Sequence, residues 1–299
     1  MAITSGHQAD LEYIEESTYG VEPASGTLQI PSDNILGVRL EPVNNAEVLY
    51  SIGDYDGQST VTGVHEVVLS FDYILQQVNT SGEHQLSDSI EYYAQYRSSG
   101  QPKSLTFYYT PKSGTIYMVN GAVCNSFEMS ASADDKTIRC HAEFWGKLTS
   151  TSNSHYNDLT SSSAIGTSYE KYGLGSVKRG GSTIESGVTS FRFTISNNLE
   201  RIPVVGSNTV TSIFAGKQEI SGDMDVLVSD GGGTIFGDMF NKNSASLVFC
   251  TGSTSSKSLK WTFSNMVYTG VPQEITNDTP FVVSSVPWVA ESVSLAGYS

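Results

Sequence analysis

The sequence predicts a mainly β protein of two tandem related domains, each a β-sandwich or partial barrel with one helix. Three observations support this fold class. Aromatic residues are frequent (16 Tyr and 12 Phe), apolar and polar side chains alternate with a two-residue period, and the chain contains an internal repeat. The length of 299 residues is also typical of two domains of ordinary size.

The internal repeat is the strongest of these observations. Residues 38–75 and 191–228 align without a gap at an offset of 153, with nine identical pairs. Beyond the predicted helices the offset shortens to 143, on the matches Asp135/Asp278 and Trp145/Trp288. A duplicated unit presents one surface twice, as in a pseudo-symmetric assembly. The identical pairs are Arg39/Arg192, Asn44/Asn197, Asn45/Asn198, Glu47/Glu200, Gly53/Gly206, Ser59/Ser212, Gly63/Gly216, Glu66/Glu219 and Asp72/Asp225.

The individual elements follow from residue periodicity, taken in chain order. Residues 1–30 are polar and turn-rich, so they are expected to form an irregular N-terminal arm. Apolar residues at alternate positions, as in Val67, Leu69 and Phe71, predict strands with one buried face. In the first domain the strands are 38–42, 66–75, 104–109, 115–119 and 138–144, with a helix at 87–98. In the second domain they are 191–195, 220–228, 246–250 and 259–263, with a short helix after Gly233.

The predicted organisation is an N-terminal arm (1–30), a first domain (31–148), a Ser/Thr/Gly-rich linker or excursion (149–187) and a second domain (188–299). Each domain has a polar excursion between its first two strands, at 44–65 and 197–218. Both excursions are long for a hairpin turn.

Composition and spacing exclude several function classes. The net charge of −15, of which residues 1–150 carry −12 (7 basic and 19 acidic side chains), disfavours binding in which nucleic acid is wrapped or held in a groove. The three cysteines and five histidines have no metal-ligand spacing, and no cofactor is expected. Asp54 and Asp56 flank a Gly-rich turn and could bind a cation, although a solvated loop tip is the favoured interpretation. No catalytic motif, secretion signal or membrane-spanning stretch is present, so the chain is expected to be non-enzymatic and assembled in a cytosol without a membrane partner.

Charged residues recur on the polar faces of the repeated strands. Two compatible interpretations are cross-strand ion pairs and a sheet face that becomes a wall in an assembly. The residues concerned are Arg39, Glu66, Asp72, Arg192, Glu219, Asp223 and Asp225.

Four segments carry a resemblance to a known family. They are Glu16–Pro23, Gly121–Asp134 followed by Phe144–Lys147, Ser190–Glu200, and Gly216–Gly222. They resemble, in this order, the opening, the mid-chain hairpin and the second-domain opening of tail tube (major tail) proteins of long-tailed viruses of bacteria and archaea. The resemblance covers most of the chain.

The resemblance implies a structural virion protein that polymerises into stacked rings. Strands of each tube domain would line a continuous inner barrel with the helix outside, and two domains per chain would give a homotrimeric ring with pseudo-sixfold symmetry. The charged residues named above would line the lumen, through which viral DNA passes during ejection without specific binding. Tape-measure and tail-completion or baseplate proteins would be further partners, in the virion tail assembled in the host cytoplasm. The excursions would reach the adjacent ring through Asn44, Asn45, Glu47, Gly53, Asp54, Asp56, Gly63, Asn197, Asn198, Glu200, Gly206 and Gly216.

One alternative from another class is a carbohydrate- or receptor-binding β-protein of the virion. Its stacking platforms would come from Tyr92, Tyr93, Tyr108, Tyr109, Trp145 and Trp288.

Overall fold

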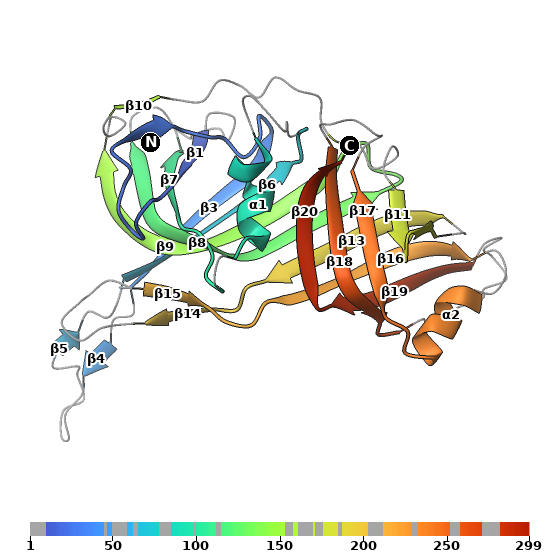
Figure 1. The fold of residues 1–299 in the computed structure, drawn as a ribbon. Coiled ribbons are helices and arrows are strands. Elements are labelled where there is room, and N and C mark those ends of the chain that lie inside the picture. Colours follow the sequence, from blue (N-terminus) through green and yellow to red (C-terminus); the bar gives the residue numbers. More distant parts are fainter. Residues whose placement is uncertain are drawn as a thin grey trace.

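The computed structural model describes residues 10–44, 47–49, 59–61, 65–77, 85–97, 100–111, 115–152, 158–160, 170, 176–184, 187–202, 212–228, 233–251, 258–270 and 282–298. These residues form a mainly β fold built around a large antiparallel sheet of 14 strands, which confirms the predicted fold class (Figure 1).

The strands and helices have the following bounds. The first part of the chain contains β1 (Asp10–Glu15), β2 (Ser25–Thr27), β3 (Ile35–Asn44), β4 (Glu47–Leu49), β5 (Ser59–Val61), β6 (His65–Ile74), a 3₁₀ turn (Leu86–Asp88), α1 (Ile90–Gln95), β7 (Leu105–Thr110), β8 (Ile116–Ser132) and β9 (Arg139–Ser152). The connecting part contains β10 (Asp158–Thr160), β11 (Ser176–Arg179) and β12 (Ser182–Thr183). The second part contains β13 (Val188–Ser196), β14 (Leu199–Ile202), β15 (Ser212–Ala215), β16 (Glu219–Val228), α2 (Gly233–Phe240), β17 (Ala245–Cys250), β18 (Ser258–Tyr268), β19 (Val282–Ala290) and β20 (Ser292–Tyr298).

The sheet contains the same strand arrangement twice. In the first unit β3 pairs with β6, β6 with β9, β9 with β8, and β8 with β7. In the second unit β13 pairs with β16, β16 with β19, β19 with β18, and β18 with β17. The excursions also match, because each carries a small antiparallel hairpin, β4–β5 in the first and β14–β15 in the second. The two tandem units are therefore related in topology as well as in sequence.

The strand pairing corrects the sequence match between Trp145 and Trp288. Leu69 lies opposite Phe144, and Gly222, which is 153 residues after Leu69, lies opposite Trp288. Trp288 is thus the counterpart of Phe144 at an offset of 144, and the expected offset of 143 is wrong by one residue. A one-residue slip reverses the face of a strand, and Trp288 is accordingly a core residue whereas Trp145 lies on the opposite face.

The core of each unit forms where the sheet curls over itself. In the first unit the ring of Phe107 on β7 lies 5.9 Å from that of Phe71 and 4.8 Å from that of Phe144, measured between centroids. In the second unit the ring of Phe249 on β17 stacks on that of Phe191 at 4.6 Å. One continuous cluster of buried apolar side chains runs through both units, so the two units share a core.

The arm and the linker contribute strands to this fold. β1 pairs with β7 and buries Leu11 and Tyr13, so the expectation of an irregular arm is wrong for these residues. Within the linker, β11 pairs with β17, and backbone groups of Glu170 bond to Leu75 and Ile138. The domain boundaries proposed from the sequence stay predictions.

Local chemistry sets two other departures from the predicted elements. The helix expected at 87–98 is only Ile90–Gln95. It begins where the Ser89 hydroxyl caps it by accepting a hydrogen bond from the Tyr92 N–H at 3.3 Å, and it ends where the backbone of Tyr96 becomes extended. The strand expected at 115–119 continues to Ser132 through Gly121, whose φ of +61° glycine tolerates at little cost. β8 and β9 form a long antiparallel hairpin, where the resemblance placed the mid-chain hairpin.

Candidate assembly interface

The two units are joined edge to edge by β8 and β13. Residues 126–132 of β8 pair with residues 190–196 of β13, while the first part of β8 pairs with β7. The counterpart of β13 in the first unit is β3. Among the residues that the structure describes, β3 pairs with β6 along one edge, and no strand pairs with its other edge.

The joint is braced by Asn197, one of the residues expected in an inter-ring loop. Asn197 is only 1% exposed, and its amide nitrogen donates to the carbonyls of Ala94 (3.1 Å) and Cys124 (2.9 Å). Its amide oxygen accepts from the guanidinium of Arg97 at 2.8 Å, and Arg97 also donates to the Gly216 carbonyl at 2.8 Å. The structure therefore places Asn197 and Gly216 at the boundary between the two units, beside the end of α1.

The position of Gly216 requires a glycine. A Cβ at this residue would lie 2.4 Å from the Asn198 carbonyl oxygen, closer than real Cβ atoms come to backbone. Asn198 itself has a φ of +46°, and its side-chain amide donates to the Lys217 carbonyl at 2.8 Å. This close approach explains the glycine at position 216 in the second copy of the repeat.

The β14–β15 hairpin packs from the second unit onto the first. Its buried side chains, Leu199 and Ile213, form a cluster with Val123 of β8, against which Trp145 of β9 also packs. The guanidinium carbon of Arg201 lies 3.9 Å from the centroid of the Trp145 ring, and Arg201 also pairs with Glu66. Arginine over an indole ring is a favourable cation–π arrangement.

This hairpin changes the environment of Glu66, a residue expected to line a lumen. The Glu66 side chain is only 17% exposed beneath Arg201. Its repeat partner Glu219 is exposed. Glu200 is also exposed, next to the exposed side chains of Ile202 and Phe214 on the outer side of the hairpin.

The other charged residues expected to line a lumen lie on one face of the continuous sheet. Cross-strand neighbours share a face, and the pairing runs from Asp72 to His141, then to Glu128 and Thr194. On β13, Arg192 lies opposite Asp223 of β16. By the same alternation the face holds Arg39, Glu66, Asp72, Arg192, Glu219, Asp223 and Asp225.

Several charges on this polar face are paired. Asp72 lies 2.8 Å from Nδ1 of His141, and Arg39 lies 2.9 Å from Glu41. Arg192 donates to Glu128 at 2.7 Å, which raises the pKa of Arg192. Burial raises the pKa of Asp223, while neighbouring Arg192 opposes this shift. The polar face thus contains ion pairs, which agrees with the first of the two interpretations; that the face becomes a wall in an assembly stays a prediction.

Sequence reasoning missed His141, Glu128, Arg97 and Arg201 as members of these contacts. The alternation through residues 138–144 does place His141 on a polar strand face, so that signal was present. Arg97 bonds to Asn197, which is 100 residues away in the chain, and Arg201 pairs with Glu66, which is 135 residues away, so no local pattern indicates these partners.

The N-terminal segment that carries the family resemblance is fixed by Glu16. Its buried carboxylate accepts hydrogen bonds from the Ser104 hydroxyl (2.7 Å), the Thr106 hydroxyl (2.8 Å) and the N–H groups of Gly121 (2.7 Å) and Gly20 (2.6 Å). Four donors stabilise a buried carboxylate without a cation. Glu16 thereby ties the turn after β1 to β7 and β8.

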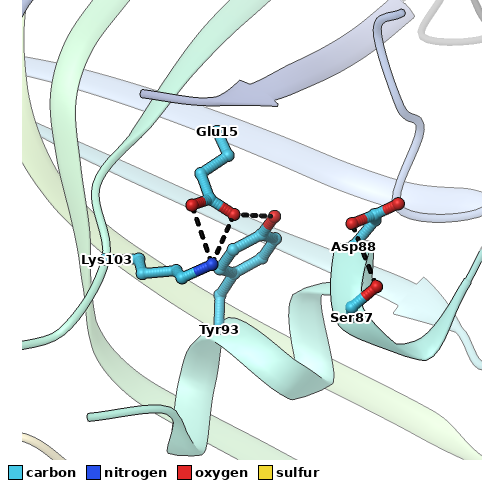
Figure 2. Close-up of polar contacts among 5 residues, drawn as sticks. All are labelled: Glu15, Ser87, Asp88, Tyr93 and Lys103. Carbon is cyan, nitrogen blue, oxygen red and sulfur yellow. Dashed lines mark hydrogen bonds and ion pairs between the residues drawn. The ribbon is translucent and has the colours of Figure 1, made fainter. Parts of the chain in front are cut away.

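Figure 2 shows how the neighbouring Glu15 positions α1. Its carboxylate accepts a hydrogen bond from the Tyr93 hydroxyl at 3.0 Å and forms an ion pair with Lys103 at 2.7 Å. In the same view Ser87 donates to Asp88 at 3.2 Å, in the turn that precedes the helix. α1 is therefore fixed to β1 through Tyr93, and the carbonyl of Ala94 near its C-terminal end accepts a hydrogen bond from Asn197.

The remaining predicted positions are partly outside the described residues. Asn45, Gly53, Asp54, Asp56, Gly63 and Gly206 lie outside them, and for Asn44 and Glu47 only the backbone is described. In the described part of the chain no group of three or more His, Cys, Asp or Glu side chains could hold a metal ion. No helix there is long and apolar enough to span a membrane.

The aromatic residues of the alternative reading do not form an exposed platform. Tyr93, Tyr108 and Trp288 are buried. Tyr92, Tyr109 and Trp145 are partly covered, Trp145 by Arg201.

These features define a duplicated β-sheet protein whose two units are joined strand to strand. The family model for phage tail tube proteins matches residues 6–290, nearly the whole chain. The chain belongs to the phage tail tube protein family, and it is a structural component of a phage tail. None of the curated proteins matches it.

Proposed function

We propose that three copies of this chain form a closed ring, and that rings stack into the tail tube through which viral DNA is ejected. The observation that carries the proposal is the difference between β3 and β13. β13 is paired along both edges, with β16 and β8, whereas β3 pairs only with β6 among the described residues. An open strand edge is a template for pairing with another chain.

The internal joint supports a specific geometry for the ring. Because the two units have the same topology, repeating the β8–β13 joint between chains would place a second-unit strand beside β3 of the next chain. Each chain would then contribute two of six similar positions, which favours a trimer with pseudo-sixfold symmetry. Closing the sheet in this way would pair the open edge of β3.

The polar face of the continuous sheet is the proposed wall of the lumen. It carries Asp72, Asp223 and Asp225, while Arg39 and Arg192 are in ion pairs with Glu41 and Glu128. A net acidic wall would repel DNA phosphates and allow passage without binding. The same proposal includes a non-enzymatic role for the chain and its assembly in the host cytoplasm. It also includes tape-measure and tail-completion or baseplate proteins as partners.

Electron microscopy of the purified protein tests the proposal. We expect rings or tubes whose averages show threefold or pseudo-sixfold symmetry. A protein that stays monomeric at high concentration would contradict it. Glycan-array binding by such a monomer would instead favour the receptor-binding alternative.

A further inference from the structure

The β14–β15 hairpin occupies a specific site on the first unit. As described above, it covers Trp145, whose cross-strand neighbours are Val123 on β8 and Val68 on β6. Arg201 of the hairpin pairs with Glu66 at the edge of the same site. The site therefore consists of two apolar residues, Trp145 on β9 and Val123 on β8, and the carboxylate of Glu66 on β6.

Strand pairing identifies the same site on the second unit. Val68 lies opposite Trp145, and its counterpart Ser221 lies opposite Val289. Val123 lies opposite Trp145, as Val267 lies opposite Val289. Val289 and Val267 thus correspond to Trp145 and Val123, and Glu219 corresponds to Glu66.

The two sites differ in exposure. On the first unit Val123 is buried, and Trp145 lies under the hairpin. On the second unit Val289 is 44% exposed, and Glu219 is exposed beside it on the same face. The position of the covered Trp145 on the first unit is therefore an exposed valine on the second unit, with no hairpin of the same chain described over it.

The repeat also indicates what that partner is. The counterpart of the β14–β15 hairpin is the β4–β5 hairpin, and position 48 of β4 corresponds to position 201 at the offset of 153. In Figure 1 the β4–β5 hairpin lies at the lower left, whereas β19 lies at the lower right. A hairpin that projects away from its own second unit can occupy the site only on another copy.

We propose that the surface formed by Val267, Val289 and Glu219 is the docking site for the β4–β5 hairpin of a second copy of this chain. This inference rests on the proposed ring, and it assigns the base of the first excursion to contacts between neighbours within one ring. The contact differs in chemistry from its internal counterpart, because Val48 and Val289 replace Arg201 and Trp145. The joint between chains lacks that cation–π pair and depends on apolar contact.

Cross-linking of the full-length protein tests the docking site. Cysteines at Val48 and Val289 are expected to form disulfides between chains, in a ladder that ends at three chains on a non-reducing gel. The native cysteines Cys124, Cys140 and Cys250 are all buried, and they are replaced by alanine in a parallel background. The matched control places the second cysteine at Ser285, an exposed residue on the same strand and face as Val289. Ser285 lies roughly 13 Å along the strand from Val289, too far to form the same disulfide.

The outcomes separate this inference from the proposed function. We expect at least about tenfold more cross-linking for the Val48/Val289 pair than for the Val48/Ser285 pair, because a disulfide requires close approach of the two Cβ atoms. If both variants form rings by microscopy and cross-link equally, or not at all, the docking site is wrong while the ring stands. If the wild-type protein forms no rings, the result contradicts both the proposed function and the docking site.

A substitution at the same position gives a second readout. Val289→Glu would bring a second carboxylate beside Glu219 and into a contact that excludes water, so the concentration needed for ring assembly should rise by about tenfold or more. Val289→Thr keeps the shape and should assemble at nearly the wild-type concentration. Equal assembly of Val289→Glu and the wild-type protein would overturn the proposal, provided that its near-UV circular dichroism shows a folded monomer.

Discussion

Arg201 of the second unit lies over the indole ring of Trp145 of the first, with its guanidinium carbon 3.9 Å from the ring centroid. The same guanidinium pairs with Glu66, whose side chain is 17% exposed. One side chain thus connects a hairpin of the second unit to β9 and β6 of the first.

Removing this contact should destabilise the protein. Arg201→Ala is expected to lower the free energy of unfolding by about 1–3 kcal/mol, because it leaves the Glu66 carboxylate largely buried without its partner. Arg201→Lys keeps the charge but loses the planar contact with Trp145, so a smaller loss is expected. Urea unfolding measures both. Arg39→Ala is the control, since Arg39 is 73% exposed in its pair with Glu41 and should change stability by less than about 0.5 kcal/mol. Equal effects of Arg201→Ala and Arg39→Ala would contradict the assigned role.

Asn197 should be the most sensitive residue of the internal joint. Asn197→Ala removes the donor to two buried carbonyls, of Ala94 and Cys124, and the acceptor of Arg97. The expected loss is about 2–4 kcal/mol, from several buried polar groups left unpaired. Asn243→Ala, at an exposed position, should lose less than about 0.5 kcal/mol. Thermal unfolding of the two variants makes the comparison, and a small loss for Asn197→Ala would refute the bracing role.

The pair of Gly222 and Trp288 makes a prediction about packing. A Cβ at Gly222 would lie 2.4 Å from the Trp288 ring and 2.4 Å from the Arg192 carbonyl oxygen. Gly222→Ala is therefore expected to destabilise the protein by about 1–3 kcal/mol. The double variant Gly222→Ala/Trp288→Phe places at position 288 the ring type found at Phe144. It should recover part of the stability that Gly222→Ala loses. Recovery should be incomplete, because the clash with the backbone of Arg192 stays. A double-mutant cycle measures the coupling, and its absence would show that the two residues do not compete for space.

The pair of Gly222 and Trp288 also shows which parts of the fold the sequence predicts and which it does not. Alternating apolar residues predict the strands, and the repeat between 38–75 and 191–228 predicts two equivalent units, because both signals are local or nearly so. The match of Trp145 with Trp288 failed because identity of residue type is a weaker guide than strand register. In the folded sheet, Gly222 lies opposite Trp288 at the place where Leu69 lies opposite Phe144 in the first unit.

Contacts between the units could not be predicted for a related reason. Arg97 and Arg201 reach partners that the chain brings near only when β8 and β13 pair. The predicted polar face of the strands is found, since its residues follow strand parity. The sequence does not reveal that Glu66 lies beneath a hairpin while Glu219 is exposed, because both residues occupy the same position in the repeat.

The buried carboxyl of Glu91 should make stability depend on pH. Glu91 lies in the first turn of α1, is 2% exposed, and accepts a hydrogen bond from the Tyr73 hydroxyl at 2.5 Å. Burial raises the pKa of Glu91 above its ordinary value of 4.5, although the hydrogen bond from Tyr73 opposes the shift. A carboxyl with a raised pKa in the folded state contributes stability that is complete below the unfolded pKa and is lost as pH rises through the folded pKa. The free energy of unfolding should therefore fall as pH rises from about 4.5 towards neutrality.

Glu91→Gln isolates this contribution. Glutamine can still accept the Tyr73 hydrogen bond but does not titrate, so the variant should lose this component of the pH dependence. Urea unfolding at several pH values between about 4 and 8 makes the comparison. Parallel pH profiles for the variant and the wild-type protein would assign the dependence to other groups.

The charged sheet face makes the prediction closest to the proposed function. Asp72→Lys and Asp225→Lys together reverse two charges of one repeat pair on the proposed lumen wall. Asp72 is exposed, and its pair with His141 is worth about 1 kcal/mol or less. Asp225 is half-buried and accepts a hydrogen bond from the Ser190 hydroxyl at 2.6 Å, which is worth about 1.5–3 kcal/mol. Folding should therefore survive, whereas cationic side chains in the lumen would attract DNA phosphates and slow ejection or hinder assembly. Asp72→Asn with Asp225→Asn is the matched control, which removes the charges without reversing them and should have a weaker effect. Phage particles that carry the lysine variant, build tubes of normal length and eject DNA at the wild-type rate would show that these residues do not line the bore.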